Sequence, residues 1–135
     1  MYREIVLFCL MSIVMSSCKQ GSSGGITEKQ LSDLHSELMA LHDSAMVKHG
    51  VSLNLIDQLD ELERNQPLAT VDSVRDALDQ SNEAMMDWMA EYTDPVTQDS
   101  TALNYLMDQL RLMKEIAHTQ SSAIDGAKNL LGTNK

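Results

Sequence analysis

Apolar residues recur at steps of three and four along the chain from residue 28 onward, which keeps their side chains on one face of an α-helix. In the first stretch these positions are Leu31, Leu34, Leu38, Leu41, Ala45, Leu55, Leu59 and Leu62. Polar Lys48 and Ser52 occupy the middle of the same stripe. Gly50 interrupts the pattern without shifting its register, so we expect it to bend this helix rather than break it.

Two later stretches show the same spacing. The second holds Val71, Val74, Leu78, Ser81, Met85, Trp88 and Tyr92. The third holds Leu103, Leu106, Leu110, Met113, Ala117, Gln120, Ile124, Ala127 and Leu131. Prolines separate the stretches, and no segment alternates with the period of two that a strand requires. The sequence therefore predicts helices over about 28–65, 70–92 and 101–131.

Residues at the ends of these stretches match known capping patterns. Residues 27–30 read Thr-Glu-Lys-Gln, a capping box at the start of the first helix. Thr70 is the expected cap of the second helix, and Asp99 or Ser100 that of the third. Gly132 is expected to end the third helix.

Short connections favour antiparallel neighbours, so the predicted fold is an all-α, up-down-up three-helix bundle. The alternative is a dimer of hairpins or a longer coiled coil. Polar Lys48, Ser52 and Gln120 lie within the apolar stripes. Such residues occur where the register or the oligomeric state of a bundle is specified, so a homo-oligomer stays open.

The N-terminal residues are typical of a targeting segment. The apolar run over residues 5–15 follows Arg3 and is too short to span a bilayer as a helix. The next residues, Met15-Ser16-Ser17-Cys18, resemble the lipobox of bacterial lipoproteins, which implies that Cys18 is the acylated N-terminus of the mature chain. The alternative is a plain signal peptide with an incidental cysteine.

This interpretation divides the chain into three parts. Residues 1–17 are the predicted lipoprotein signal peptide, and residues 18–26 are the acylated N-terminus and a Gly/Ser tether. Residues 27–132 form the predicted helical bundle. Acyl chains on Cys18 would anchor the protein to a membrane.

Composition and charge exclude several classes of protein. The chain has 20 acidic and 10 basic residues, a balance that disfavours nucleic-acid binding. Residues 28–99 hold 16 acidic and four basic residues, which indicates a solvated acidic face or one that recruits cations or a basic partner. Two cysteines cannot form a four-thiolate zinc site or a disulfide-rich scaffold.

Histidine and methionine form a second stripe on the first helix, at His35, Met39, His42, Met46 and His49. Met85, Met89 and Met113 from the other helices are expected near the level of Met46 and His49. Methionine ordinarily fills aromatic-poor cores, and this is the interpretation we adopt, with no metal site and no cofactor assigned. The alternative is copper or haem bound by His42, Met46, His49, Met89 and Met113.

Motifs of known enzymes are not found. The sequence has no His-Glu-x-x-His motif, and Glu-x-x-His occurs once, at Glu115–His118, where a di-iron bundle needs two copies. His42 and Asp43 are adjacent, so we expect their side chains to point apart on a helix. We therefore expect a protein that is not an enzyme.

Residues 39–50 (MALHDSAMVKHG) and 83–89 (EAMMDWM) together resemble a family of small helical lipoproteins from Bacteroidota, often labelled "viral A-type inclusion protein". The resemblance implies an anchored envelope protein with a helical-bundle fold and brings no established activity. The family places another methionine where this chain has His49.

These observations lead to one functional expectation. The chain is a lipid-anchored, non-enzymatic structural or partner-binding module of the cell envelope, with an envelope protein as its partner. Residues 19–22 lack the acidic pair that resembles a surface-export signal. We therefore expect the periplasmic face of the outer membrane.

Overall fold

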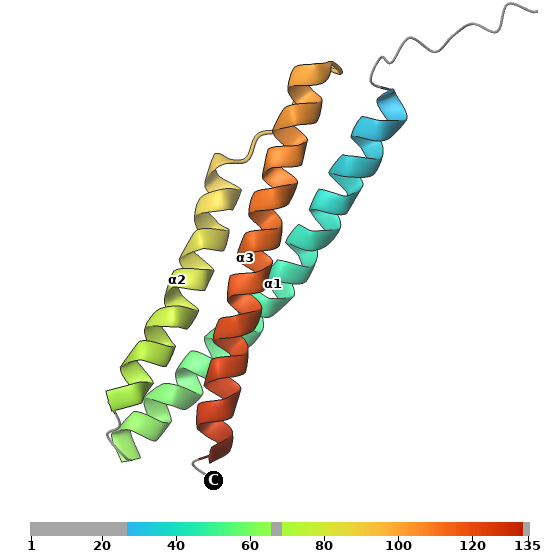
Figure 1. The fold of residues 1–135 in the computed structure, drawn as a ribbon. Coiled ribbons are helices and arrows are strands. Elements are labelled where there is room, and N and C mark those ends of the chain that lie inside the picture. Colours follow the sequence, from blue (N-terminus) through green and yellow to red (C-terminus); the bar gives the residue numbers. More distant parts are fainter. Residues whose placement is uncertain (1–26, 66–68, 134–135) are drawn as a thin grey trace, which may run out of the picture.

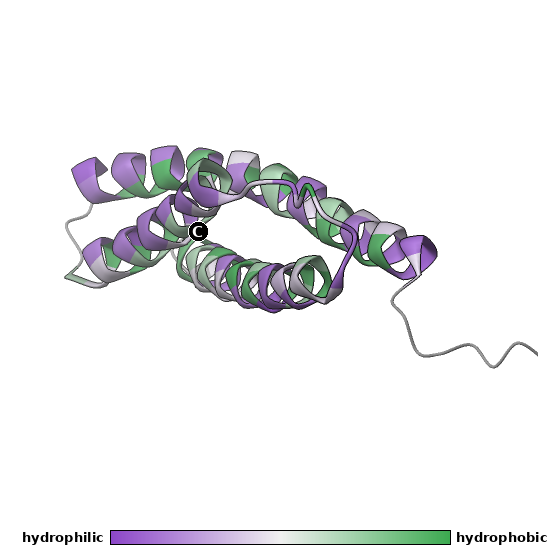
Figure 2. Cartoon of the chain, turned by 90° about the horizontal axis from the view of Figure 1, so that it is seen from above, coloured by the Kyte–Doolittle hydropathy of each residue, from purple (hydrophilic) through white to green (hydrophobic). Residues whose placement is uncertain are grey.

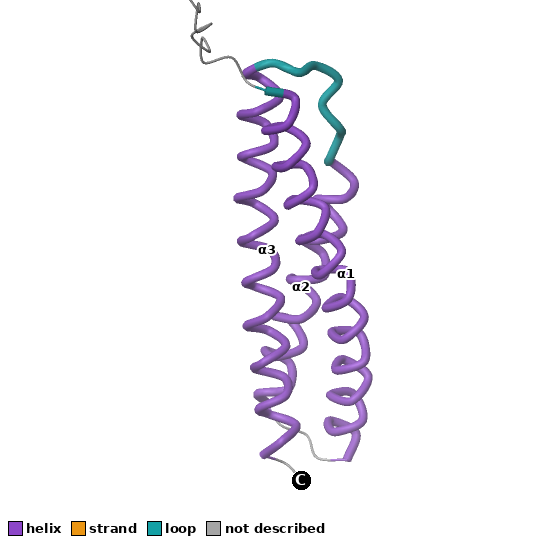
Figure 3. The backbone as a smooth tube through the Cα atoms, turned by 90° about the vertical axis from the view of Figure 1, so that its right-hand side faces the viewer, coloured by secondary structure: helices purple, strands orange, loops and turns teal. Residues whose placement is uncertain are grey.

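The computed structural model describes residues 27–65 and 69–133, and within these ranges it contains three helices and no strand. The helices are α1 (Glu28–Asn65), α2 (Ala69–Glu91) and α3 (Ser100–Thr133). They run side by side in the order up, down, up, and the α2–α3 loop lies at the end where α1 begins (Figures 1 and 3). The predicted all-α three-helix bundle is confirmed. The predicted signal peptide and tether lie outside the described residues.

Two of the predicted helix starts are confirmed by their hydrogen bonds. Gln30 N donates to Thr27 Oγ1 at 3.2 Å, and Thr27 N donates to Gln30 Oε1 at 2.8 Å, so the capping box is formed. Asp99 Oδ1 accepts hydrogen bonds from Thr101 N at 2.9 Å and Ala102 N at 3.1 Å. Asp99 is therefore the cap of α3.

Two other predicted ends are wrong. Helix α2 already begins at Ala69, so Thr70 lies in its first turn and not at the capping position. Helix α3 continues through Gly132 to Thr133. A glycine ends a helix by adopting a positive φ, and none of the described glycines does so. Gly50 likewise lies inside an uninterrupted α1.

Helix α1 is inclined to the other two. In Figure 1 its last turns lie beside the start of α2, and its first turns lie on the other side of α3. The view along the bundle in Figure 2 shows both hydrophobic and hydrophilic residues around each helix. This amphipathic pattern is what the steps of three and four predict.

The buried apolar side chains form two clusters along the bundle. The loop-proximal core, nearer the α2–α3 loop, contains Leu31, Leu38, Ala45, Met85, Trp88, Ala102, Leu106, Leu110, Met113 and Ile116. The distal core contains Leu55, Leu59, Val71, Leu78, Ala123, Ile124 and Ala127. Leucine and methionine fill most of this volume because the chain has few aromatic residues.

A polar layer separates the two cores. Its buried members are Ser52, Ser81, Asn82 and Gln120. Lys48 reaches the same level from α1 and donates to Ser121 Oγ at 2.8 Å and to the Ala117 carbonyl at 3.3 Å. The polar positions at Lys48, Ser52 and Gln120 that interrupt the sequence stripes therefore come together inside the bundle.

Candidate functional site

The contact between α1 and α2 brings His42 onto Trp88. Their ring centroids are 5.7 Å apart, and the ring planes are tilted by 38°. His42 Nδ1 lies 3.1 Å from Asp43 Oδ1, so the expectation that these adjacent side chains point apart is wrong. The short Asp43 side chain turns along the helix surface toward the imidazole at the edge of the α1–α2 contact.

A second contact between α1 and α2 lies near the start of α2. Arg75 Nε donates to Asp60 Oδ1 at 2.8 Å, and Arg75 also pairs with Glu63. Hydrogen bonds from Arg75 to Glu63 and Asp60 raise the pKa of its guanidinium. Counting along the antiparallel helices from the His42–Trp88 contact places Met46 opposite Ala84. Counting from the Asp60–Arg75 contact places Met46 opposite Met89.

We name the region around His42, Met46, Trp88 and Met89 the His/Met seam. Met46 is half-buried and packs against the loop-proximal core. Met89 is 37% exposed, and the His42 side chain is 25% exposed. The seam therefore lies at the solvent edge of the bundle, with its inner side against the core.

The other two predicted candidates lie elsewhere. Met113 is fully buried in the loop-proximal core on α3. His49 lies two turns beyond His42, beside the polar layer, and its Nδ1 is buried without a hydrogen-bond partner among the described residues. Of the five candidates, His42 and Met46 thus lie one turn apart on α1, and the two α1–α2 contacts place Met89 on α2 opposite residues 41 to 46.

Within the described ranges, no three side chains among His, Cys, Asp and Glu are placed to hold a metal ion. The His/Met seam adds thioether sulfur, a soft metal ligand that is not among these four residue types.

The three aromatic residues of the helical region form a column that begins in the seam at Trp88. Tyr92 stacks on Trp88 with centroids 4.7 Å apart, and Tyr105 lies 6.1 Å from Tyr92. Trp88 Nε1 donates to Gln109 Oε1 at 2.8 Å. The column joins α2 to α3. The apolar pattern of the sequence did not indicate the hydrogen bond between Trp88 and Gln109.

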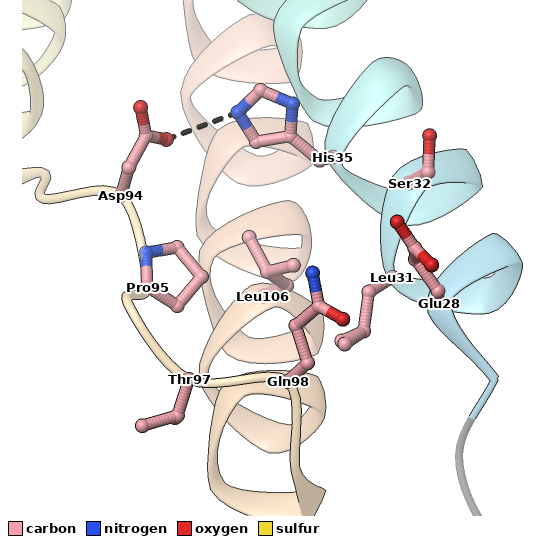
Figure 4. Close-up of a pocket in the computed structure, with 9 residues that line it drawn as sticks. All are labelled: Glu28, Leu31, Ser32, His35, Asp94, Pro95, Thr97, Gln98 and Leu106. Carbon is pink, nitrogen blue, oxygen red and sulfur yellow. Dashed lines mark hydrogen bonds and ion pairs between the residues drawn. The ribbon is translucent and has the colours of Figure 1, made fainter.

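A pocket of about 290 Å³ lies between the first turns of α1 and the α2–α3 loop (Figure 4). Across it, His35 Nε2 lies 3.0 Å from Asp94 Oδ1, and Tyr92 Oη donates to the same oxygen at 2.8 Å. Hydrogen bonds from Tyr92 and His35 lower the pKa of Asp94, and burial together with Asp94 raises the pKa of Tyr92. These three residues tie the loop to α1.

A shallow groove of about 580 Å³ follows the contact between α1 and α3. It is lined by Leu34, Met107, Leu110, Arg111, Lys114, Glu115 and His118. Met107 is 55% exposed, and Lys114 Nζ pairs with Glu37 Oε1 at 2.9 Å. His118 therefore lies in this groove and not in the His/Met seam.

Comparison of the chain with family models, with curated proteins and with solved structures finds no match. The resemblance to the Bacteroidota lipoproteins therefore stays a prediction from the two motifs. Among the described helices, none contains a stretch apolar enough to cross a membrane.

Proposed function

We propose that this chain is a lipid-anchored, non-enzymatic helical bundle that binds a partner protein at the cell envelope. In this proposal Cys18 carries the lipid, and residues 19–26 tether the bundle to the periplasmic face of the outer membrane. Helix α1 begins directly after this tether, at the end of the bundle that also holds the α2–α3 loop.

The observation that carries the partner-binding role is the α1–α3 groove. Its floor is apolar, with Leu34, Leu110 and the largely exposed Met107. A continuous apolar groove at a helix–helix contact is a common docking surface for an amphipathic helix. The groove therefore supports a helical segment as the occupant.

The charged residues along the groove indicate which residues the partner segment carries. The chain carries a net charge of −10, yet Arg111, Lys114 and His118 gather along this groove. Arg111 and Lys114 are paired with Glu115 and Glu37 in exposed ion pairs, which contribute little free energy and can be exchanged. We propose that the partner helix presents an apolar face flanked by acidic residues.

Site-specific photocrosslinking tests this role in cells. A benzophenone amino acid replaces Met107 in the groove, and in a matched control it replaces Val47, which is 71% exposed on α1. We expect Met107, and not Val47, to give a discrete adduct. Mass spectrometry should place the crosslink in an amphipathic segment with acidic flanks, and Lys114→Glu should reduce the yield. Equal adducts at both positions, or none at Met107, would contradict the proposal.

A further inference from the structure

We propose that the His/Met seam binds one Cu(I) ion, with His42 Nε2, Met46 Sδ and Met89 Sδ as ligands and the Trp88 ring closing one side. This inference does not depend on the lipid anchor or on the α1–α3 groove. It rests on the contact of His42 with Trp88, and on the helical spacing and register that place Met46 and Met89 within about one turn of it.

The imidazole of His42 has a carboxylate partner of the kind that metal-binding histidines have. Its Nδ1 lies 3.1 Å from Asp43 Oδ1. When Nδ1 carries the proton it donates to this carboxylate, and Nε2 then has the free lone pair that a metal ion binds. Metal-binding histidines commonly use such a carboxylate to fix the tautomer and the ring orientation.

The two thioethers flank this imidazole. Met46 follows His42 by one helical turn, so both side chains lie on the α2-facing side of α1. The antiparallel register places Met89 across from the turn between His42 and Met46. Thioether sulfur and imidazole nitrogen together favour Cu(I) over harder cations such as Mg²⁺ or Ca²⁺.

Trp88 closes one side of the site. Its ring centroid is 5.7 Å from that of His42, and its Nε1 is held by Gln109 Oε1 at 2.8 Å. The hydrogen bond and the stacked Tyr92 fix the plane of the indole. A soft monovalent cation held by His42 would lie near the π face of this ring, where a cation is stabilised by the ring quadrupole.

The solvent exposure of the seam and the acidic residues near it also favour binding of a cation. Met89 is 37% exposed, so a copper donor can reach the sulfur without opening the bundle. The exposed carboxylate of Asp43 lies next to His42 in the sequence, and that of Asp87 lies two residues before Met89. In a chain with a net charge of −10, the local potential attracts cations to this edge.

The test is a Cu(I) titration of the full chain in detergent under anaerobic, reducing conditions. Cys9→Ser and Cys18→Ser are present throughout, because free thiols would bind Cu(I) themselves. A chromophoric Cu(I) chelator competes with the protein, and the fluorescence of Trp88 reports on the seam, since the chain has one tryptophan. We expect one equivalent to be taken from the chelator at micromolar concentration, with quenching of Trp88.

Matched variants assign the ligands. We expect His42→Gln, Met46→Leu and Met89→Leu each to weaken binding by more than about tenfold. Leucine keeps the volume of methionine, so the helical content should be unchanged. Met107→Leu and His118→Gln alter the same residue types in the α1–α3 groove and should bind as the parent does. No transfer from the chelator, unchanged Trp88 fluorescence, or undiminished binding in the triple variant would overturn the proposal.

Discussion

Asp99 shows how one side chain ends a loop and starts a helix. Its Oδ1 accepts hydrogen bonds from the free N–H groups of Thr101 and Ala102 at the start of α3. These bonds, that from Ala102 foremost, lower the pKa of Asp99 below its ordinary value. The cap therefore acts as an ionised carboxylate near neutral pH.

This cap gives the bundle a specific dependence on pH. A carboxyl group whose pKa is lowered by folding stabilises the fold above its unfolded pKa of about 3.9, and this contribution is lost as the pH falls through the folded pKa. Asp99→Asn keeps a capping side chain but removes the titration. We expect its free energy of unfolding to approach that of the parent as the pH falls from 5 to 2.

Urea denaturation at a series of pH values measures this difference. Asp94 has a lowered pKa as well, so the single variant should retain part of the acid-induced loss. Two curves that stay parallel from pH 7 to pH 2 would show that Asp99 does not titrate as the structure indicates.

The residues that the sequence predicts correctly are those whose partners are close in the chain. Thr27 and Gln30 are three positions apart, and Asp99 bonds to the next turn. His35 and Asp94 are 59 positions apart, and no local pattern marks them as partners. Their hydrogen bond depends on where the α2–α3 loop returns, which side-chain spacing alone does not specify.

At the scale of the helices, the steps of three and four predict the three elements because each helix buries one face. The predicted ends at Thr70 and Gly132 are wrong because helix α2 starts one residue earlier and α3 runs past its glycine. The spacing also identifies His42, Met46 and Met89 as candidates. Their alignment across the two helices depends on contacts such as that of Arg75 with Asp60, which the spacing of apolar residues does not indicate.

Gly50 is the residue with the lowest helix propensity within α1. It lies inside the helix, and a Cβ atom added there would meet nothing within 4 Å. Gly50→Ala should therefore raise the free energy of unfolding by about 1 kcal/mol, through helix propensity and a less flexible unfolded chain.

Gly126→Ala in α3 is the matched control, since its added Cβ also meets nothing within 4 Å. Thermal unfolding followed by circular dichroism should show a similar increase for both variants. A lower stability of Gly50→Ala than of the parent would mean that α1 needs to bend at this position.

At the scale of the whole molecule, the polar layer divides one bundle into two cores. The side-chain amide atoms of Asn82 and Gln120 and the Ser52 hydroxyl are buried without hydrogen-bond partners among the described residues. Such groups lower stability, but they also disfavour shifted registers in which they would meet an apolar core. We infer that the layer fixes the alignment of the three helices.

Substitution of two glutamines on α3 tests whether the polar layer sets the helix alignment or only fills space. Gln120→Met keeps the side-chain length and removes the unpartnered amide, so we expect the free energy of unfolding to rise by about 1 kcal/mol. Gln109→Met removes the acceptor of Trp88 Nε1, so we expect a decrease of similar size.

Chemical denaturation measures both changes, and sedimentation shows whether the oligomeric state is kept. If the layer sets the alignment, Gln120→Met gains stability but allows other oligomers to form. A loss of stability in Gln120→Met would mean that the amide is well solvated or paired, contrary to this interpretation.

The proposed placement of the bundle beside a membrane depends on a single residue, because the proposed role at the envelope requires a lipid on Cys18. Fractionation of cells that express the full chain, with the intact mass of the recovered protein, tests this most directly. We expect the parent in the membrane fraction, beginning at Cys18 and carrying the added mass of its acyl groups, and Cys18→Ser released from the membrane. An unmodified parent chain, or a Cys18→Ser variant retained quantitatively in the membrane, would contradict the central claim.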